Sequence, residues 1–426
     1  MRNVSRKMLD CRLLGGHAKT IFLSSITIAA IIFIFSADCL VSMVHISSSL
    51  IEVKEFDSEV SQIHKTERIM KSTIREHIQL HSTHELIIEE VVYTENQNSL
   101  VPPFNVTEAE RIQWFREKLP EIKIFKSNNS SQEYHNRVLE FFDKKCEVKF
   151  FMTWISPVQS FTRREFIAIE SLFKAHPCGC LMILSESLDS KKGYGILKPL
   201  IDRRFKVTAV KPDLAFLVKN TPAETWFQEM KNGYKDPGEI PLAQNLSNLL
   251  RLLVLYKYGG IYLDTDFIVL KSFIGLRNSI GAQSIDAVSR NWTRLNNAVL
   301  VFDREHPVLF KFIEEFAATF DGNKWGHNGP YLVSRVAQKL SGRPGFNFTV
   351  LPPMAFYPVN WNKIGGFFKK PGNKADSRWV KAKLLQLSGD TYGVHLWNKQ
   401  SSRIRIEEGS VMARLISDQC VICEYS

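Results

Sequence analysis

The 426-residue sequence lacks the patterns that identify nucleic-acid-binding proteins. Its net charge of +11 would suit a polyanionic partner. However, the positive residues are spread along the chain, with no zinc-finger spacing, RNA-binding signature or basic repeat. We therefore expect no nucleic-acid partner and interpret the charge as a solvated basic surface, which would also favour anionic substrates or membranes.

Cysteine is scarce, and five of the seven cysteines follow the apolar N-terminal segment: Cys146, Cys178, Cys180, Cys420 and Cys423. The spacing of Cys178 and Cys180 is short for zinc ligands. We predict structural disulfides with one cysteine left over, and a zinc site is the alternative. The spacing of the cysteines does not predict which of them are bonded to each other.

Charge is absent from residues 21–37, and the apolar character resumes after Asp38 through Val44. This length is enough to cross a thin bilayer. Five cations precede the segment, so the positive-inside tendency keeps the N-terminus in the cytosol. No small-x-small site closes the segment, which favours a signal-anchor over the alternative of a cleaved signal peptide.

These features predict a cytosolic tail at residues 1–20 and a transmembrane signal-anchor at 21–44. We expect a single-pass type II protein of the Golgi membrane, whose remaining chain lies in the lumen. Triplets for N-glycosylation, which fit a lumenal domain, begin at Asn105, Asn128, Asn129, Asn245, Asn291 and Asn347.

Core-forming patterns are also missing between residues 45 and 135. Val53 to Ile74 approximates a 3–4 repeat that is too short to establish a coiled coil, although it offers a route to a homo-oligomer. Residues 96–131 contain Pro102-Pro103 and mixed charges, as in a linker. We predict a flexible stem at 45–135 and a soluble lumenal domain at 136–426.

From Cys146 onward, apolar strands alternate with helical patterns. Strands are predicted at 148–155, 181–184, 205–210, 261–263, 267–270 and 299–302, and helices at 164–175, 196–205 and 242–258. This alternation predicts an α/β fold, with a mixed, mostly parallel sheet and helices on both faces. Ligands of such sheets bind beyond the carboxyl ends of the strands.

Asp264-Thr265-Asp266 follows one of these predicted strands, after a helix that ends at Gly259-Gly260. Two nearby carboxylates repel each other, and burying either one alone is costly. A divalent cation removes both problems and leaves positions for a diphosphate. Mn²⁺ and Mg²⁺ both accept carboxylate, phosphate and water ligands.

The run RLLVLYKYGGIYLDTDFIVLK, at residues 251–271, resembles the signature of glycosyltransferase family 32. The resemblance is closest to lactosylceramide 4-α-galactosyltransferases and related α-1,4-N-acetylglucosaminyltransferases, in a plant-type form. It extends from about Val148 to near the C-terminus and includes KWGHNGP at 324–330, FYPV at 356–359 and VHLWN at 394–398.

This resemblance implies a GT-A fold, with a sugar-binding part at about 147–275 and a C-terminal α-1,4-glycosyltransferase part at about 290–420. It implies Mn²⁺ or Mg²⁺, a nucleotide-sugar donor such as UDP-galactose, and a glycan or glycolipid acceptor. The α-linking relatives imply that the configuration of the transferred hexose is retained. No second nucleophilic carboxylate is evident in the sequence.

The resemblance also assigns candidate residues. Asp266 would bind the metal, and Asp264 the metal or the donor ribose. Arg251 and Asn248 would contact the donor sugar, although related enzymes carry Asp where this chain has Asn248. The remaining candidates are Asn297 near the reacting sugar, Tyr262, Trp325 and His327 at the donor, and His395 as a further metal ligand.

Two other functions stay open at this point. A catalytically impaired, glycan-binding or scaffolding Golgi protein of the same fold would explain the loss of charge at Asn248. A metal-dependent phosphodiester hydrolase would need more His and Asp ligands than the sequence offers.

Overall fold

The computed structural model describes residues 101–126, 131–143 and 145–423. Residues Asn98–Ser426 form a compact unit. The expected tail, the signal-anchor and the repeat that would support a homo-oligomer lie outside the described residues. Within those residues, no helix is both long and apolar enough to span a bilayer.

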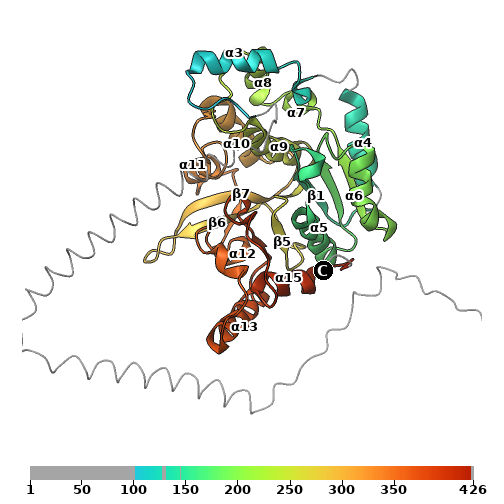
Figure 1. Cartoon of the computed structure of the whole chain (residues 1–426). Coiled ribbons are helices and arrows are strands. Elements are labelled where there is room, and N and C mark those ends of the chain that lie inside the picture. The colour runs from blue at the N-terminus through green and yellow to red at the C-terminus, as the bar shows by residue number, and fades with distance from the viewer. Residues whose placement is uncertain (1–100, 127–130, 144, 424–426) are drawn as a thin grey trace, which may run out of the picture. The chain divides into compact units, whose positions relative to one another are not determined.

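A seven-stranded mixed sheet forms the centre of the domain (Figure 1). Its strands, in spatial order, are β3 (Lys206–Val210), β2 (Cys180–Leu184), β1 (Lys149–Thr153), β4 (Gly260–Leu263), β7 (Trp292–Phe302), β6 (Ser279–Ile285) and β8 (Thr349–Leu351). The pairs β3–β2, β2–β1, β1–β4 and β6–β8 are parallel, whereas β4–β7 and β7–β6 are antiparallel. The expected α/β fold with a mostly parallel sheet is confirmed.

Helices cover both faces of this sheet. The α-helices are α3 (Glu108–Lys118), α4 (Ser131–Asp143), α5 (Arg163–Ala175), α6 (Lys191–Asp202), α7 (Leu214–Val218), α8 (Ala223–Lys231), α9 (Leu242–Tyr258), α10 (Pro307–Thr319), α11 (Pro330–Leu340), α12 (Pro353–Phe356), α13 (Lys374–Ser388), α14 (Asn398–Ser401) and α15 (Val411–Gln419). Short 3-10 helices are η1 (Lys123–Phe125), η2 (Val158–Ser160) and η3 (Ile364–Phe367).

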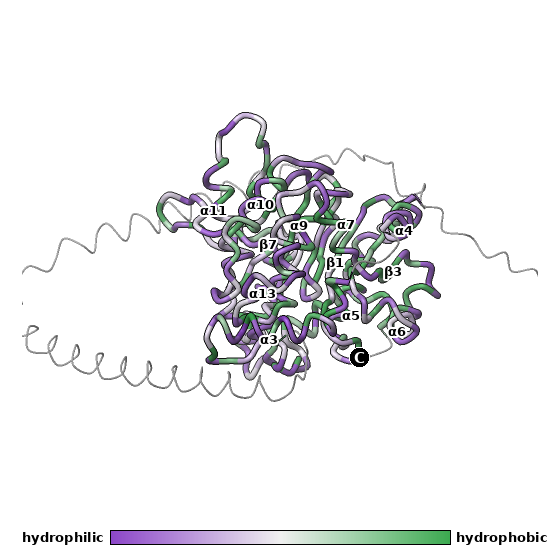
Figure 2. The backbone as a smooth tube through the Cα atoms, turned by 90° about the horizontal axis from the view of Figure 1, so that it is seen from above, coloured by the Kyte–Doolittle hydropathy of each residue, from purple (hydrophilic) through white to green (hydrophobic). Residues whose placement is uncertain are grey.

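Because side chains alternate along a strand, β1 contributes to two cores. Phe151 packs into one core with α9 and α10, while Phe150 and Met152 pack into another with α5 and α6. In Figure 2 the tube is green over much of the centre, around β1 and α5, and more purple towards the outer loops.

The turn between α9 and β4 positions the expected metal ligands. Gly259 and Gly260 have φ values of 63° and 123°, which favour glycine. A Cβ on Gly260 would lie 2.6 Å from the carbonyl oxygen of Lys149 on β1. The glycines therefore let the chain leave α9 and enter the sheet directly beside β1. The predicted helix at 242–258 has the same bounds as α9.

Residues 107–143 correct our domain boundary. Phe115, Ile122 and Phe125 are at most 3% exposed and belong to the same core as α9. Arg111 is 4% exposed and donates from Nε and Nη2 to the Asp236 carboxylate, at 2.7 and 2.6 Å. Residues 107–126 and 131–135 are therefore part of the domain rather than a linker or stem, and the compact unit begins at Asn98.

A two-stranded antiparallel sheet joins the segment after Asp264-Thr265-Asp266 to the C-terminal part of the chain. Its strands are β5 (Phe267–Val269) and β9 (Gly393–His395), with Phe267 opposite His395. Gly393 is needed here, because a Cβ would lie 2.2 Å from a ring carbon of Phe267. This pairing brings His395 next to Asp266, although 129 positions separate them in the sequence.

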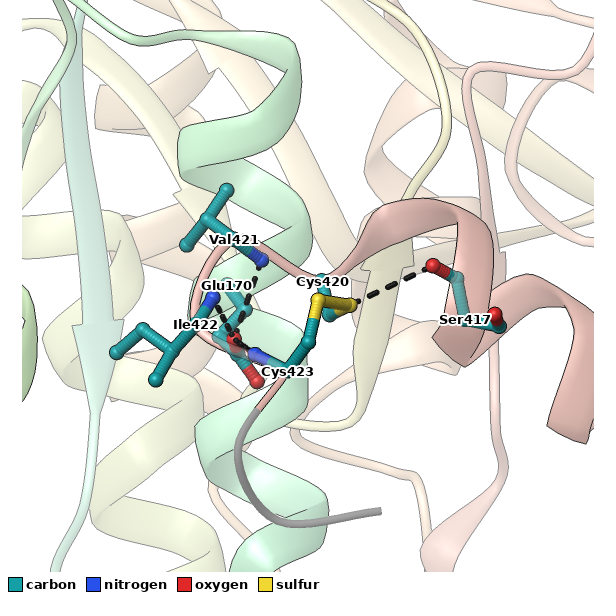
Figure 3. Close-up of a disulfide and its surroundings, with 6 residues drawn as sticks. All are labelled: Glu170, Ser417, Cys420, Val421, Ile422 and Cys423. Atoms are coloured by element: carbon teal, nitrogen blue, oxygen red, sulfur yellow. Dashed lines mark hydrogen bonds between the residues drawn. A yellow bond between two sulfur atoms is a disulfide. The ribbon is translucent and has the colours of Figure 1, made fainter.

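Four of the five cysteines in the described residues form disulfides, as expected, so these four are not zinc ligands. Cys146 is bonded to Cys180, and Cys420 to Cys423, so Cys178 is the cysteine outside both bonds. The first bond ties the loop before β1 to β2. The second closes a turn at the end of α15 (Figure 3).

The C-terminal turn wraps around a buried carboxylate on α5 (Figure 3). Glu170 is 1% exposed, and its Oε1 accepts hydrogen bonds from the backbone N–H groups of Val421, Ile422 and Cys423, at 3.2, 2.8 and 3.4 Å. Glu170 therefore fixes the end of the chain against the second core, into which Ile422 packs.

Glu170→Ala is expected to lower the free energy of unfolding by about 1–3 kcal/mol, because three N–H groups lose their acceptor and that of Ile422 is buried. Glu170→Gln keeps an acceptor oxygen and should lose less than half as much. Chemical denaturation under oxidising conditions measures both changes. An unchanged stability of Glu170→Ala would show that the turn is not held by this carboxylate.

Candidate active site

A cavity of about 570 Å³ opens beyond the carboxyl ends of β1 and β4. Its lining includes Thr153 at the end of β1 and the segment Asp264–Asp266 after β4. Seven of the nine predicted site residues line it: Asn248, Arg251, Asp264, Asp266, Asn297, Trp325 and His395. Its position agrees with the rule for ligand sites of α/β sheets.

Asp264 is held by two neighbours from the helix and strand that precede it. The Tyr262 hydroxyl donates to its Oδ1 at 2.9 Å, and Arg251 Nη2 lies 3.0 Å from the same oxygen. Burial raises the pKa of Asp264 above its ordinary value, which Arg251 opposes and the nearby Asp266 reinforces. The carboxylate is thus oriented by fixed donors.

Asp266 is held by the C-terminal part of the domain. His395 Nε2 lies 3.2 Å from its Oδ1, and the backbone N–H of Asn398 donates to its Oδ2 at 2.8 Å. Burial would raise the pKa of Asp266, but the charge and hydrogen bond of His395 outweigh it and hold the pKa below its ordinary value. This environment keeps Asp266 ionised.

The three candidate metal ligands converge. One ligand atom each from Asp264, Asp266 and His395 fall within 4.8 Å of one another. Two polar atoms beside them are buried without a hydrogen-bond partner, His395 Nδ1 and the side-chain oxygen of Asn398. Buried polar atoms are normally satisfied. Two carboxylates, an imidazole and an amide oxygen are together a donor set that suits Mn²⁺.

Arg251 is a buried member of the site, not a surface cation of its helix. It is 3% exposed, and its guanidinium lies over the Tyr262 ring, 4.6 Å from the centroid. It donates to the Ser247 hydroxyl at 2.9 Å and to the backbone oxygen of Asn297 at 2.8 Å. Arg251 therefore ties α9, β4 and β7 together behind Asp264.

Asn248 and Asn297 form an amide pair at the base of the cavity. Asn297 Nδ2 donates to Asn248 Oδ1 at 2.9 Å, and the two residues are 3% and 5% exposed. A Cβ on Gly329 would lie 2.7 Å from Asn248 Oδ1, so glycine lets the start of α11 approach this amide. The uncharged side chain of Asn248 therefore has a hydrogen-bond partner in Asn297.

Two predicted donor residues are not brought to the cavity surface. Tyr262 is fully buried and acts through Asp264. His327 does not line the cavity, because its Nε2 is 2.8 Å from the backbone oxygen of Thr319. Its neighbour Trp325 does line it and is 50% exposed.

Several lining residues were not predicted from the sequence. Lys399 Nζ lies 3.8 Å from the centroid of the Trp325 ring, and Asn398 contacts Asp266. Thr153 and Ser247 form a hydroxyl chain to Tyr262, with oxygen–oxygen distances of 2.6 and 2.8 Å. Asn398 and Lys399 could have been predicted as lining residues from their position directly after the VHLW segment.

The Asn245 triplet for N-glycosylation lies inside α9. Asn245 is 3% exposed, lines the cavity and accepts a hydrogen bond from Asn328 Nδ2 at 2.9 Å. It is therefore not accessible for glycan attachment in the folded domain.

Comparisons with known proteins agree with this geometry. The alpha 1,4-glycosyltransferase conserved region matches residues 301–425, and the glycosyltransferase sugar-binding region containing the DXD motif matches residues 162–286. Lactosylceramide 4-alpha-galactosyltransferase of Mus musculus is 34% identical over 265 residues, which are 59% of this chain and 68% of that protein. The chain belongs to the alpha-1,4-glycosyltransferase family. It is a hexosyltransferase, and a DXD region of this kind implies a divalent metal ion and a nucleotide-sugar.

Two other relatives are less similar in sequence and are matched over a smaller part of their own length. Alpha-1,4-N-acetylglucosaminyltransferase of Homo sapiens is 26% identical over 202 residues, which are 45% of this chain and 53% of that protein. An uncharacterised Arabidopsis thaliana protein is 30% identical over 293 residues, 66% of this chain and 43% of that protein.

Among solved structures, PaToxG glycosyltransferase is 18% identical with a TM-score of 0.34, covering 73% of this chain and 95% of that one. The apo form of the glycosyltransferase GlyE from Streptococcus pneumoniae is 10% identical with a TM-score of 0.37, covering 64% and 60%. Both are distant likenesses.

Proposed function

We propose that this chain is a metal-dependent, retaining hexosyltransferase with a GT-A fold. It would move galactose or N-acetylglucosamine from a nucleotide-sugar such as UDP-galactose to a glycan or glycolipid in α linkage. The observation that carries this proposal is the convergence of Asp264, Asp266 and His395 at the cavity. The two sugars are those named for the relatives.

Asp264, Asp266, His395 and the Asn398 side-chain oxygen would hold Mn²⁺ or Mg²⁺. When bound, such an ion neutralises charge on the departing diphosphate. The chain's own contribution is orientation: Arg251 and Tyr262 fix Asp264, and the Asn398 N–H fixes Asp266. Ligands that are already in place cost less entropy when the donor binds.

The α-linking relatives suggest retention, and the cavity lining bears on the route it would take. Among the lining residues, Asp264 and Asp266 are the only carboxylates, and both are candidate metal ligands. No other carboxylate is in place to form a covalent glycosyl intermediate. Without such an intermediate, retention would require the acceptor to attack the face from which the diphosphate leaves.

The alternative function is a catalytically impaired, glycan-binding Golgi protein, which the loss of charge at Asn248 would suggest. The Asn248–Asn297 amide pair weakens that alternative, because Asn248 is hydrogen-bonded and Arg251 already has Asp264 as its partner. A charged residue at position 248 is therefore not required to balance Arg251.

The experiment that separates these functions is hydrolysis of nucleotide-sugars by the purified protein, with and without Mn²⁺. We expect slow, Mn²⁺-dependent release of UDP from UDP-galactose or UDP-N-acetylglucosamine, and faster release with a saccharide acceptor. Binding of UDP with no turnover of any common nucleotide-sugar would favour the glycan-binding alternative.

We further propose that the protein lies in the Golgi membrane with its catalytic domain in the lumen, anchored by residues 21–44. The basic leader before the uncharged 21–37 segment supports this topology. In intact Golgi vesicles, a C-terminal tag should survive protease until detergent is added. Digestion of the tag without detergent would contradict the orientation.

A further inference from the structure

Most of the net positive charge of this chain comes from one segment of the C-terminal part. Residues 363–414 contain eleven Lys and Arg residues against four Asp and Glu, which gives +7 of the chain's net +11. The other 44 of the 55 cations are spread along the rest of the chain, as expected, where 40 Asp and Glu residues nearly balance them. The eleven cations are Lys363, Lys369, Lys370, Lys374, Arg378, Lys381, Lys383, Lys399, Arg403, Arg405 and Arg414.

None of these eleven cations is ion-paired with any residue that the structure describes. Elsewhere in the domain, surface cations commonly have partners, such as Arg137 with Asp189 at 3.0 Å and Lys311 with Glu314 at 2.7 Å. The unpaired cations leave the segment with an uncompensated positive surface. Such a surface attracts an anionic partner over about one Debye length.

Helix α13 lies at the centre of this segment and is poorly covered by the rest of the domain. Of its fifteen residues, only Val380 and Leu387 are buried. Lys374, Arg378 and Lys381 follow each other at intervals of four and three residues, so they share one helix face. Leu385, four residues further, continues that stripe and is 76% exposed.

This arrangement is unfavourable for an isolated helix. Like charges one turn apart repel each other. Lys374 also lies in the first turn, where the helix dipole disfavours a cation. Trp379 lies outside the stripe, about 100° around the helix from Arg378, and is 41% exposed. A partner that is both anionic and apolar would neutralise the repelling cations, balance Lys374 in the first turn and cover Trp379.

The helix is joined to the cavity by a small core. Val380 and Leu387 pack with Val394 and Leu396, which flank His395. The Trp379 ring meets Phe367 of η3 edge-on, at 6.1 Å between centroids. Figure 1 shows α13 at the edge of the C-terminal part, beyond α12 and α15. A surface that holds α13 would therefore also fix the orientation of the metal site.

We propose that α13 and its basic flanks, at residues 363–405, dock on an anionic lipid membrane. Cations interleaved with an exposed Trp and Leu are the composition of helices that lie in the membrane interface. A nucleic acid or another soluble polyanion would use the cations but leave Trp379 and Leu385 exposed to water. Docking does not depend on the transferase reaction, so its test needs no turnover.

The test is hydrogen–deuterium exchange of the purified full chain mixed with lipid nanodiscs. One nanodisc contains only phosphatidylcholine, and the other also contains phosphatidylglycerol. We expect the amides of α13 to exchange at least about five-fold more slowly with the anionic nanodisc, because each cation near the surface adds to the attraction. In 0.5 M NaCl the difference should disappear, and α6 should show none.

The matched variants carry the same change of charge at two places. Lys374→Glu, Arg378→Glu and Lys381→Glu together should abolish the protection of α13. Lys191→Glu, Lys192→Glu and Lys198→Glu on α6 should leave it intact. A triple change of Lys374, Arg378 and Lys381 to Gln, which adds no negative charge, guards against misfolding and should reduce protection in part.

Equal exchange of α13 with both nanodiscs would overturn the proposal, as would protection that survives the α13 charge reversal. Protection by heparin with none from the anionic nanodisc would overturn it in favour of a soluble polyanion. Loss of UDP-sugar turnover in these samples would bear only on the proposed function.

Discussion

Asp266→Asn is expected to lower metal-dependent transfer or donor hydrolysis by more than about 100-fold, because the change removes a metal ligand and not merely a residue behind one. The metal-free protein should lose some stability, because His395 holds the pKa of Asp266 below its ordinary value and the ionised carboxylate therefore stabilises the fold. The loss is limited, since His395 can give up its proton and leave no unpaired charge. Steady-state kinetics with varied Mn²⁺ and thermal melting measure the two effects.

Melting with ligands gives a second measure of the same change. With Mn²⁺ and UDP at one hundred times the dissociation constant, the wild-type protein should gain about 2.7 kcal/mol by linkage. Asp266→Asn should lose most of that gain. Asp390→Asn, which changes an exposed carboxylate outside the cavity lining, is the control and should behave as wild type.

Asp264→Asn should behave differently from Asp266→Asn in the metal-free protein. Arg251 is 3% exposed, cannot lose its proton, and has Asp264 as its ionic partner. The expectation that neutralising either of two repelling carboxylates costs nothing omits Arg251, which would lose its ionic partner. Burial raises the pKa of Asp264, so removing its charge also removes a desolvation cost. We therefore expect Asp264→Asn to change the stability of the metal-free protein less than Asp266→Asn does.

A chain that starts at Asn136 is expected not to fold, in contrast to one that starts at Asn98. The shorter chain lacks Phe115, Ile122 and Phe125, and burying each such side chain contributes about 1.5–3 kcal/mol. The sum is comparable with the whole stability of a typical domain. Secretion yield and a cooperative melting transition, both under oxidising conditions, are the measurements.

A substitution within the longer chain controls for the effect of truncation itself. Phe115→Ala should cost about 3–5 kcal/mol, as for other fully buried aromatic residues. If the chain from Asn136 is soluble and melts cooperatively, the packing of α3 and η1 does not contribute to stability, and the stem would then extend to residue 135.

The sequence was most informative where one short pattern decides the structure. Helix α9 and strand β4 follow from a periodic apolar run and Gly259-Gly260, and the two aspartates follow β4 directly, separated by one residue. No tertiary information is needed to place such neighbours at one end of a strand.

The sequence was least informative where long-range contacts decide the structure. Helix α3 buries only Arg111 and Phe115, so it has no apolar period to recognise. Arg111 is buried because Asp236 pairs with it, 125 positions away. Likewise, family resemblance suggested His395, but only the β5–β9 pairing shows how it reaches Asp266.

The most direct test is the stoichiometry of Mn²⁺ binding. It is measured by electron paramagnetic resonance of the free Mn²⁺ during titration with the protein and UDP. The account predicts one Mn²⁺ per chain in the presence of UDP, and a large loss of binding in Asp266→Asn and in His395→Ala. Unchanged free Mn²⁺ on addition of wild-type protein and UDP, or equal binding by wild type and Asp266→Asn, would contradict it.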